Sequence, residues 1–237
     1  MLILFDIDAT LIKTGGAGML ALADAGRLLF GPGFSVEGVA FAGRLDPLII
    51  GDLLVRNGIE PTPEHRAAMR RGYREALEAR FAAESGSWAL PGVHELLGAL
   101  GGLADRDWGG DGARPTLGLL TGNFSETGTL KLKLAGIDPE GFRVCVWGDD
   151  SPHDPPEREH LPGVAFERVR AAWGRPARGA EVVVVGDTPH DISCARAHGC
   201  RVLAVATGQF SVADLGHADR TVEDLSETEE VVRWLMG

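Results

Sequence analysis

The sequence predicts an α/β protein with a doubly wound, Rossmann-like parallel sheet and a small helical domain inserted after the first strand. Short apolar runs without polar interruptions lie far apart along the chain, and each ends in polar or glycine residues. Strands that are buried on both faces of a parallel sheet have this pattern. Stretches of helical periodicity separate the runs, and such alternation is typical of a doubly wound sheet, which binds ligands beyond the carboxyl ends of its strands.

Four apolar runs are the expected strands. They are Leu2 to Phe5, Leu117 to Leu120, Val182 to Val185 and Val202 to Ala206. The residues that could carry chemistry follow directly after these runs. We therefore expect the functional site at one edge of the sheet.

A different pattern fills the stretch between residues 14 and 90. It contains helical segments with few β-branched residues, joined by glycine-rich turns. These segments are Met19 to Phe30, Pro47 to Asn57 and Glu64 to Ala83. We expect residues 14–90 to form a helical cap over the active edge of the sheet, and residues 1–13 and 91–237 to form the core domain.

Composition narrows the class of protein. The chain has 237 residues, 44% of them hydrophobic, and a formal charge of −11, which argues against a nucleic-acid binder. It shows neither a signal peptide nor an apolar stretch long enough for a bilayer span, and its three cysteines lack metal-ligand spacing. We expect a cytoplasmic protein, a monomer or homodimer, that binds neither nucleic acid nor a membrane.

Pairs of acidic residues follow two of the expected strands. Asp6 and Asp8 follow the first run, and Asp187 and Asp191 follow the third. Carboxylates held this close raise one another's pKa, and a bound cation removes that penalty. Mg²⁺ prefers oxygen ligands of this kind. The combination predicts a magnesium site.

The acidic motifs resemble those of the haloacid dehalogenase superfamily. Phe5-Asp6-Ile7-Asp8-Ala9-Thr10-Leu11 resembles motif I, usually written DxDGT. Leu120-Thr121-Gly122-Asn123 resembles motif II, and Gly186-Asp187-Thr188-Pro189-His190-Asp191 resembles motif IV. The motifs occur in family order and span almost the whole chain, with the helical insertion where the C1 cap of the family is expected. Overall the chain is similar to the phosphoglycolate phosphatase-like branch.

The resemblance implies a Mg²⁺-dependent phosphatase that hydrolyses a small phosphorylated metabolite through an aspartyl-phosphate. Asp6 would attack the phosphorus and bind the metal. Asp8 would protonate the leaving oxygen and then activate water, while its backbone carbonyl binds the metal. Asp187 and Asp191 would complete the Mg²⁺ site.

Motif II supplies the expected contacts to the phosphoryl group. The resemblance implies that Thr121 donates a hydrogen bond to a phosphoryl oxygen, and that Gly122 and Asn123 also bind the substrate. In the insertion, Gly43-Arg44 resembles the specificity loop of capped members, where Arg44 would bind an anionic part of the substrate. The alternative for Arg44 is an ion pair with Asp46.

The chain departs from the motif I pattern at Ala9, which replaces the usual glycine. A positive φ at this position would cost alanine about 1 kcal/mol or more. The consequence for activity depends on the backbone conformation that this position adopts.

A second departure concerns the lysine that the family places before the last core helix, where it contacts the nucleophile and the phosphate. We expect residues 149–162 to be an exposed loop, and Pro155 to Leu161 contains no lysine. Lys131 is our first candidate for the missing cation, Arg158 the second and Lys13 the third. The alternative for Lys131 is an ordinary lysine on a helix surface.

Several alternatives share these motifs. A dehalogenase uses the same scaffold and nucleophile but lacks the acid that Asp8 supplies. A phosphomutase would share every motif. A catalytically inactive phosphometabolite-binding protein is also compatible with Ala9 and the missing lysine. A response-regulator receiver is about half this length and carries no helical cap.

Overall fold

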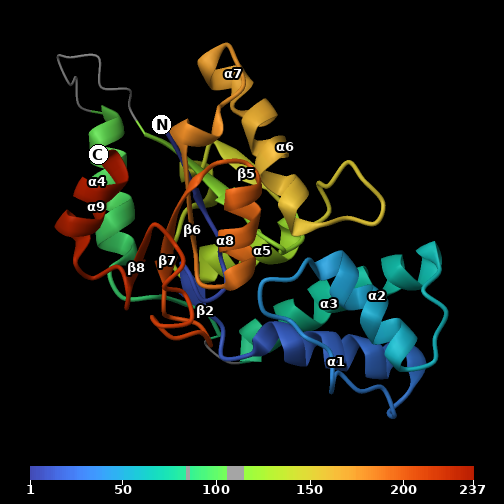
Figure 1. Ribbon diagram of the computed structural model, residues 1–237. Helices are drawn as coiled ribbons and strands as arrows, with labels where there is room; N and C mark the ends of the chain where they lie inside the picture. The colour runs from blue at the N-terminus through green and yellow to red at the C-terminus, as the bar shows by residue number, and fades with distance from the viewer. Residues whose placement is uncertain (84–85, 106–114) are drawn as a thin grey trace.

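The computed structural model describes residues 1–83, 86–105 and 115–237, and in this part six parallel strands form one sheet (Figure 1). The strand order is β5-β4-β1-β6-β7-β8. Their bounds are β1 (Leu2–Phe5), β4 (Thr116–Leu120), β5 (Val144–Val146), β6 (Val182–Gly186), β7 (Arg201–Val205) and β8 (Arg220–Val222). Because the chain builds outward from β1 first on one side and then on the other, the strand order reverses at β1. Ligands bind at such a switch point in open α/β sheets.

Helices cover both faces of the sheet. Side chains alternate along β1, so that Ile3 and Phe5 enter one apolar core while Leu2 and Leu4 enter the other. The first core is closed by α4 (Val93–Asp105), α5 (Ser125–Leu134) and α9 (Thr228–Met236), and the second by α6 (Leu161–Arg168) and α8 (Pro189–Ala197). The shorter helices are α7 (Arg170–Trp173) and the 3₁₀ turns Pro139–Gly141, Arg158–His160 and Gly179–Glu181. The predicted fold class, a doubly wound α/β sheet, is confirmed.

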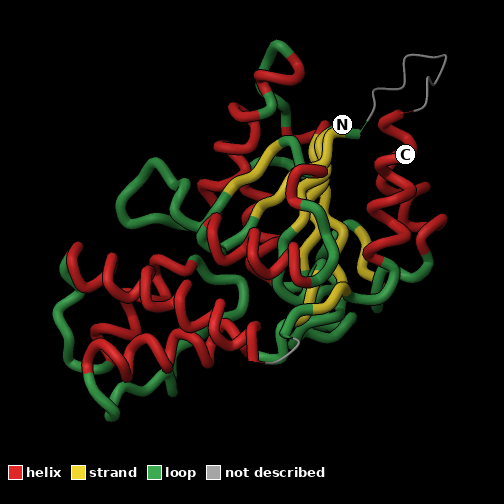
Figure 2. The backbone as a smooth tube through the Cα atoms, turned by 180° about the vertical axis from the view of Figure 1, so that it is seen from behind, coloured by secondary structure: helices red, strands yellow, loops and turns green. Residues whose placement is uncertain are grey.

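Three helices form a separate layer at the end of the sheet where β1 ends (Figures 1 and 2). They are α1 (Ala17–Phe30), α2 (Asp46–Arg56) and α3 (Pro63–Ala83), and they share an apolar core of their own. A two-stranded antiparallel ribbon of β2 (Ile12–Lys13) and β3 (Trp88–Ala89) carries the chain into and out of this layer. None of the described helices has both the length and the apolar character of a bilayer span.

Some elements escaped the sequence analysis. The strands β5 and β8 have three residues each, which is too short for a periodic pattern. The stretch 149–162 is not simply an exposed loop, because it contains the 3₁₀ turn Arg158–His160 and the start of α6, and Arg158 is buried. That prediction was wrong because proline and charge content do not reveal which single side chain turns inward.

The chain between α1 and α2 crosses the edge of the sheet as a strap, residues 41–46. The N–H of Asp46 donates to the carbonyl of Gly122 at 2.7 Å, and the carboxylate of Asp46 accepts from the N–H of Phe124 at 3.1 Å. A Cβ on Gly122 would lie 2.1 Å from the carbonyl oxygen of Arg44. Glycine is therefore required in motif II for the strap to pass this closely.

Ala9 adopts a left-handed conformation, with φ of 58°. Its N–H donates to the carbonyl of Ile12 at 2.7 Å, and its own carbonyl accepts from the hydroxyl of Thr207 at 2.5 Å. These contacts hold the tight turn that follows β1. The position therefore has the backbone conformation that favours glycine, and alanine is strained there.

We expect Ala9→Gly to raise the free energy of unfolding by up to about 1 kcal/mol, because glycine adopts this conformation without a steric penalty. Urea unfolding followed by circular dichroism measures the change. Ala67→Gly, the same substitution at an exposed position of α3, is the matched control and should lower the free energy of unfolding by about 1 kcal/mol. Equal losses in both variants would contradict strain at Ala9.

Candidate active site

A cavity of about 490 Å³ lies between the carboxyl ends of β1, β4 and β6 and the helical layer. With the exception of Asp191, every residue that the sequence analysis proposed for the site lines this cavity. These lining residues are Asp6, Asp8, Lys13, Arg44, Thr121, Gly122, Asn123, Lys131, Arg158 and Asp187. Segments far apart in the chain thus meet at the switch point of the sheet, as expected.

Three buried carboxylates converge at one end of the cavity. Oxygens of Asp6, Asp187 and Asp191 lie within 4.8 Å of one another. Burial raises the pKa of Asp6 to about 6, against the charge of Arg158. Burial, followed by the charges of Asp191 and Asp6, raises the pKa of Asp187 to about 8. The cluster therefore holds like charges at a cost that a cation would relieve.

Both carboxylate oxygens of Asp191 accept hydrogen bonds from the protein. One of its oxygens accepts from the N–H and the hydroxyl of Thr188, at 3.0 and 2.7 Å, as part of the capping box that starts α8. Its other oxygen accepts from Nη2 of Arg158 at 2.5 Å. A Cβ on Gly186 would lie 2.2 Å from its carboxyl carbon. Asp191 therefore anchors Arg158, and its predicted part in metal binding stays a prediction.

Arg158 is the cation that contacts Asp6. Its Nη2 lies 3.2 Å from Oδ1 of Asp6 in addition to its contact with Asp191, and its Nη1 donates to the carbonyl of Gly43 in the strap at 3.3 Å. Its buried Nε has no partner among the described residues. Burial alone would lower the pKa of Arg158, but the charges of Asp191 and Asp6 raise it above its usual value. Our second candidate thus occupies the place that the missing lysine would take beside the nucleophile.

Lys131 lies elsewhere in the cavity. It is 4% exposed, and its Nζ contacts both carboxylate oxygens of Asp8 at 2.8 and 3.0 Å. The interpretation of Lys131 as a solvated surface lysine was wrong. Because α5 begins only at Ser125, the rise to Lys131 is about 9 Å, and helical side chains lean towards the N-terminal end. Lys131 therefore reaches the acid Asp8, whereas Arg158 reaches Asp6.

Asn123 connects the groups on this side of the cavity. Its Oδ1 accepts from Lys131 at 2.6 Å, and its Nδ2 donates to Asp8 and to the hydroxyl of Thr121, at 2.8 Å each. The amide orients Asp8 and leaves no free donor for a substrate. Because Thr121 Oγ1 accepts from Asn123, its hydroxyl hydrogen remains available, and it has no acceptor among the described residues. The N–H of Gly122 is likewise without a partner there.

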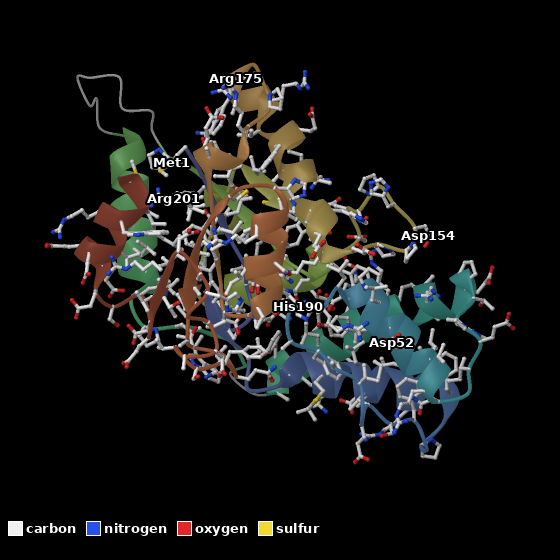
Figure 3. The ribbon with its side chains drawn as sticks, viewed as in Figure 1. Met1, Asp52, Asp154, Arg175, His190 and Arg201 are labelled. Atoms are coloured by element: carbon white, nitrogen blue, oxygen red, sulfur yellow. The ribbon has the colours of Figure 1, made fainter. Side chains whose placement is uncertain are left out.

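Arg44 does not pair with Asp46, which the sequence analysis gave as the alternative. Its Nη1 lies 2.6 Å from Oδ2 of Asp52 on α2, which Figure 3 labels on the helical layer. Asp46 is instead buried at the strap, where burial raises its pKa to about 7. Arg44 and Asp46 lie close together in the sequence. However, α2 starts at Asp46, and Asp52, nearly two turns further along this helix, is the carboxylate that reaches the guanidinium of Arg44.

Among the lining residues that were not proposed from the sequence are Asp46, Tyr73 and Gly208. Asp46 and Tyr73 come from the helical layer, and their burial depends on how that layer meets the core. Gly208 follows β7, where a Cβ would lie 1.8 Å from Oδ2 of Asp187. Only Gly208 carried a signal in the sequence, because it follows the apolar run of a predicted strand.

The carboxylate cluster fits Mg²⁺ on the chemistry of its donors, since Mg²⁺ takes hard oxygen ligands. Within the described ranges Asp187 forms no ion pair, and its side chain accepts only a 3.4 Å hydrogen bond from Thr10. The carbonyl oxygen of Asp8 accepts no hydrogen bond from the described residues. Asp6, Asp187 and the Asp8 carbonyl are therefore the oxygens best able to bind the metal, because both oxygens of Asp191 are engaged.

We expect Mg²⁺ to raise the melting temperature by at least about 3 °C at pH 8 and by less at pH 5.5, measured against K⁺ at equal ionic strength. Because the pKa of Asp187 is raised to about 8, the folded state binds more protons than the unfolded state between about pH 4 and 8, so without Mg²⁺ stability falls as the pH rises through this window. Protons compete with the metal at the lower pH.

Asp187→Asn should remove most of this Mg²⁺ effect and flatten the pH dependence. Asp154→Asn, at an exposed position outside the cluster, is the control and should behave as wild type. An equal Mg²⁺ effect in Asp187→Asn and wild type would rule out the proposed ligand set.

Comparisons with known proteins agree with this fold. Residues 163–228 match the family described as HAD-hydrolase-like. No curated protein matches the chain. Similar solved structures are a hydrolase from Pseudomonas syringae (22% identity, TM-score 0.70, covering 100% of this chain and 99% of that one) and a protein described as a predicted phosphoglycolate phosphatase from Haemophilus somnus (20%, 0.70, 98% and 97%).

A third similar structure is a haloacid dehalogenase-like hydrolase from Bacteroides fragilis, with 17% identity, a TM-score of 0.69 and coverage of 95% of this chain and 98% of that one. The resemblance that the motifs indicated is thereby confirmed. The chain has the fold of haloacid dehalogenase-like hydrolases over nearly its full length, and the segment from residue 163 to residue 228 matches the HAD-hydrolase-like family.

Proposed function

We propose that the protein is a Mg²⁺-dependent phosphatase that hydrolyses a small phosphate monoester through an aspartyl-phosphate at Asp6. The observation that carries the proposal is the position of Asp6: it lies at the switch point, with Arg158 at 3.2 Å and the carboxylate of Asp187 close enough to share a cation. A carboxylate is a poor nucleophile in water, but in-line positioning and cationic neighbours make the attack feasible.

Asp6 attacks the phosphorus, and the bond from phosphorus to the leaving oxygen breaks. The Thr121 hydroxyl and the Gly122 N–H have free hydrogens in the cavity and donate to the phosphoryl oxygens, and Arg158 adds its charge beside Asp6. When bound, Mg²⁺ neutralises the charge of the phosphoryl group and holds this group in position. Donors that are already oriented when the charge develops account for most of the rate acceleration in such reactions.

Asp8 enters the reaction protonated and supplies its proton to the leaving oxygen. As a carboxylate it then takes a proton from the water that attacks the phosphorus, and the bond between phosphorus and the Asp6 oxygen breaks to release phosphate. The side chain of Asp8 is 42% exposed, so it reaches both the leaving group and water from the cavity. Lys131 and Asn123 fix its orientation from behind. Because Lys131 contacts Asp8 and not Asp6, its role is to position the acid, which differs from our first expectation.

We further propose that residues 14–90 act as a cap that closes the cavity, with residues 1–13 and 91–237 as the core. The strap supports this division, because it contacts motif II at Gly122 and the start of α8 at Thr188, to which a Cβ on Gly43 would come within 2.7 Å. A closed cap excludes water from the phosphoryl group until Asp8 activates one molecule.

One observation favours a phosphatase over a dehalogenase. Asp8 is present and held in place by Lys131 and Asn123, whereas a dehalogenase lacks this acid. A phosphomutase shares these residues, and hydrolysis of the aspartyl-phosphate by water is the reaction that distinguishes a phosphatase from it.

We expect Asp6→Asn to lower Mg²⁺-dependent hydrolysis of 4-nitrophenyl phosphate by at least about 10³-fold, because an amide cannot form the phosphoryl-enzyme. Release of 4-nitrophenol measures the rate, and circular dichroism confirms the fold. Equal rates for wild type and Asp6→Asn would refute the covalent mechanism.

Lys131→Ala should lower turnover at least about tenfold with an alkyl phosphate but less with 4-nitrophenyl phosphate, whose leaving group needs no proton.

Arg158→Ala should lower kcat/KM for both esters by a similar factor of about 10² or more, because Arg158 contacts the nucleophile. Steady-state kinetics with the two esters separates these roles. A similar loss for both esters in Lys131→Ala would show that Lys131 does not act through Asp8.

A further inference from the structure

The cations deepest in the cavity are already paired with acids. Arg158 contacts Asp6 and Asp191, and Lys131 contacts Asp8. These ion pairs serve the phosphoryl group and its proton transfers. They leave no buried positive charge for a second anionic group on the substrate.

Arg44 is the cation that the resemblance assigned to such a group, but its charge is balanced as well. Its Nη1 lies 2.6 Å from the carboxylate of Asp52, and the side chains of the pair are 27% and 52% exposed. The remaining guanidinium N–H groups can still donate to an uncharged oxygen. Lys13 is the one lining cation without an ion pair to a described residue, and it is exposed on β2, where solvent and salt screen its charge.

The helical layer contributes apolar and aromatic side chains to the wall of the cavity. Leu22 of α1, Phe41 of the strap, Ile49 of α2 and Tyr73 of α3 line it, and all belong to the apolar core of the helical layer or pack against it. A leaving group against this wall gains from apolar contact, about 25 cal/mol for each Å² removed from water. A charged group there would lose its hydration without a free partner.

We propose that the leaving group is uncharged: the substrate carries a single phosphoryl group on an alcohol whose remainder is apolar or carries neutral hydrogen-bond acceptors, with no carboxylate or second phosphate. This inference rests on the proposed function. Its basis is the pairing of Arg44 with Asp52 beside the apolar and aromatic side chains of the helical layer, in a cavity of about 490 Å³ whose other buried cations are engaged.

Isosteric esters test the proposal, because they differ in charge and hardly in shape. One pair is 4-carbamoylphenyl phosphate and 4-carboxyphenyl phosphate, and the other is the phosphate ester of glycolamide and that of glycolate. We expect kcat/KM with Mg²⁺ to be at least tenfold higher for each amide than for its carboxylate. Equal or higher values for the carboxylates would overturn the proposal.

Asp52→Asn tests the cause. The substitution keeps the shape of the side chain but frees the charge of Arg44, so it should raise kcat/KM for the carboxylates at least fivefold and leave the amides within about twofold. The ratio between variant and wild type cancels differences in leaving-group chemistry. Glu78→Gln is the matched control: Glu78 is also 52% exposed, lies in the same helical layer and pairs with Arg74 instead.

The possible results separate the two proposals. A gain with the carboxylates in Asp52→Asn but not in Glu78→Gln supports the assignment, and no gain, or the same gain in both, overturns it. Hydrolysis that depends on Asp6 but prefers the carboxylates overturns this inference and leaves the proposed function standing. No Mg²⁺-dependent hydrolysis of any ester, 4-nitrophenyl phosphate included, overturns the proposed function itself.

Discussion

The site depends on the compensation of carboxylates that the fold buries where β1 and β6 end. An uncompensated buried charge costs several kcal/mol, so a cluster of acids persists only where each has a counter-charge or takes up a proton. Arg158 compensates Asp6 and Asp191, and Lys131 compensates Asp8. Asp187 forms no ion pair with the described residues, and burial together with the charges of Asp191 and Asp6 raises its pKa to about 8. The imbalance at Asp187 is the physical reason to expect a divalent ion on that side of Asp6.

In the proposed reaction, the division between Arg158 and Lys131 also separates two chemical tasks. The cation beside Asp6 would stabilise charge on the phosphoryl group, whereas the cation beside Asp8 would hold the proton carrier in place. Asn123 joins Lys131 and Asp8 to Thr121, so one amide orients both the proposed proton carrier and the hydroxyl proposed to bind the phosphoryl group. Such shared orientation makes the effects of single substitutions non-additive, since removing one member frees the others.

The sequence was sufficient for four of the six strands of the sheet, the three helices of the insertion and the acids, because these depend on local patterns: apolar runs, helical periodicity and acids at strand ends. It could not separate Lys131 from Arg158, because the choice depends on where α5 begins and on which side chain of the loop before α6 turns inward. Asp46 and Asp52 show the same limit. Asp46 and Asp52 both follow Arg44 within one short stretch of sequence. The direction of α2 decides that Asp52 pairs with Arg44, whereas Asp46 is buried against motif II.

Arg158 makes contacts that a lysine at this position would not make together. Its planar fork contacts Asp6, Asp191 and the carbonyl of Gly43 at once, whereas an ammonium is a single point charge on a flexible stem. The same side chain therefore touches the nucleophile, the start of α8 and the strap. Movement of the strap away from the core would remove one of these contacts, and the position of the guanidinium beside Asp6 would then rest on the two carboxylates alone. The proposed closure of the helical layer and the geometry of Asp6 are thus linked through Arg158. The link depends on the shape of the guanidinium as well as on its charge.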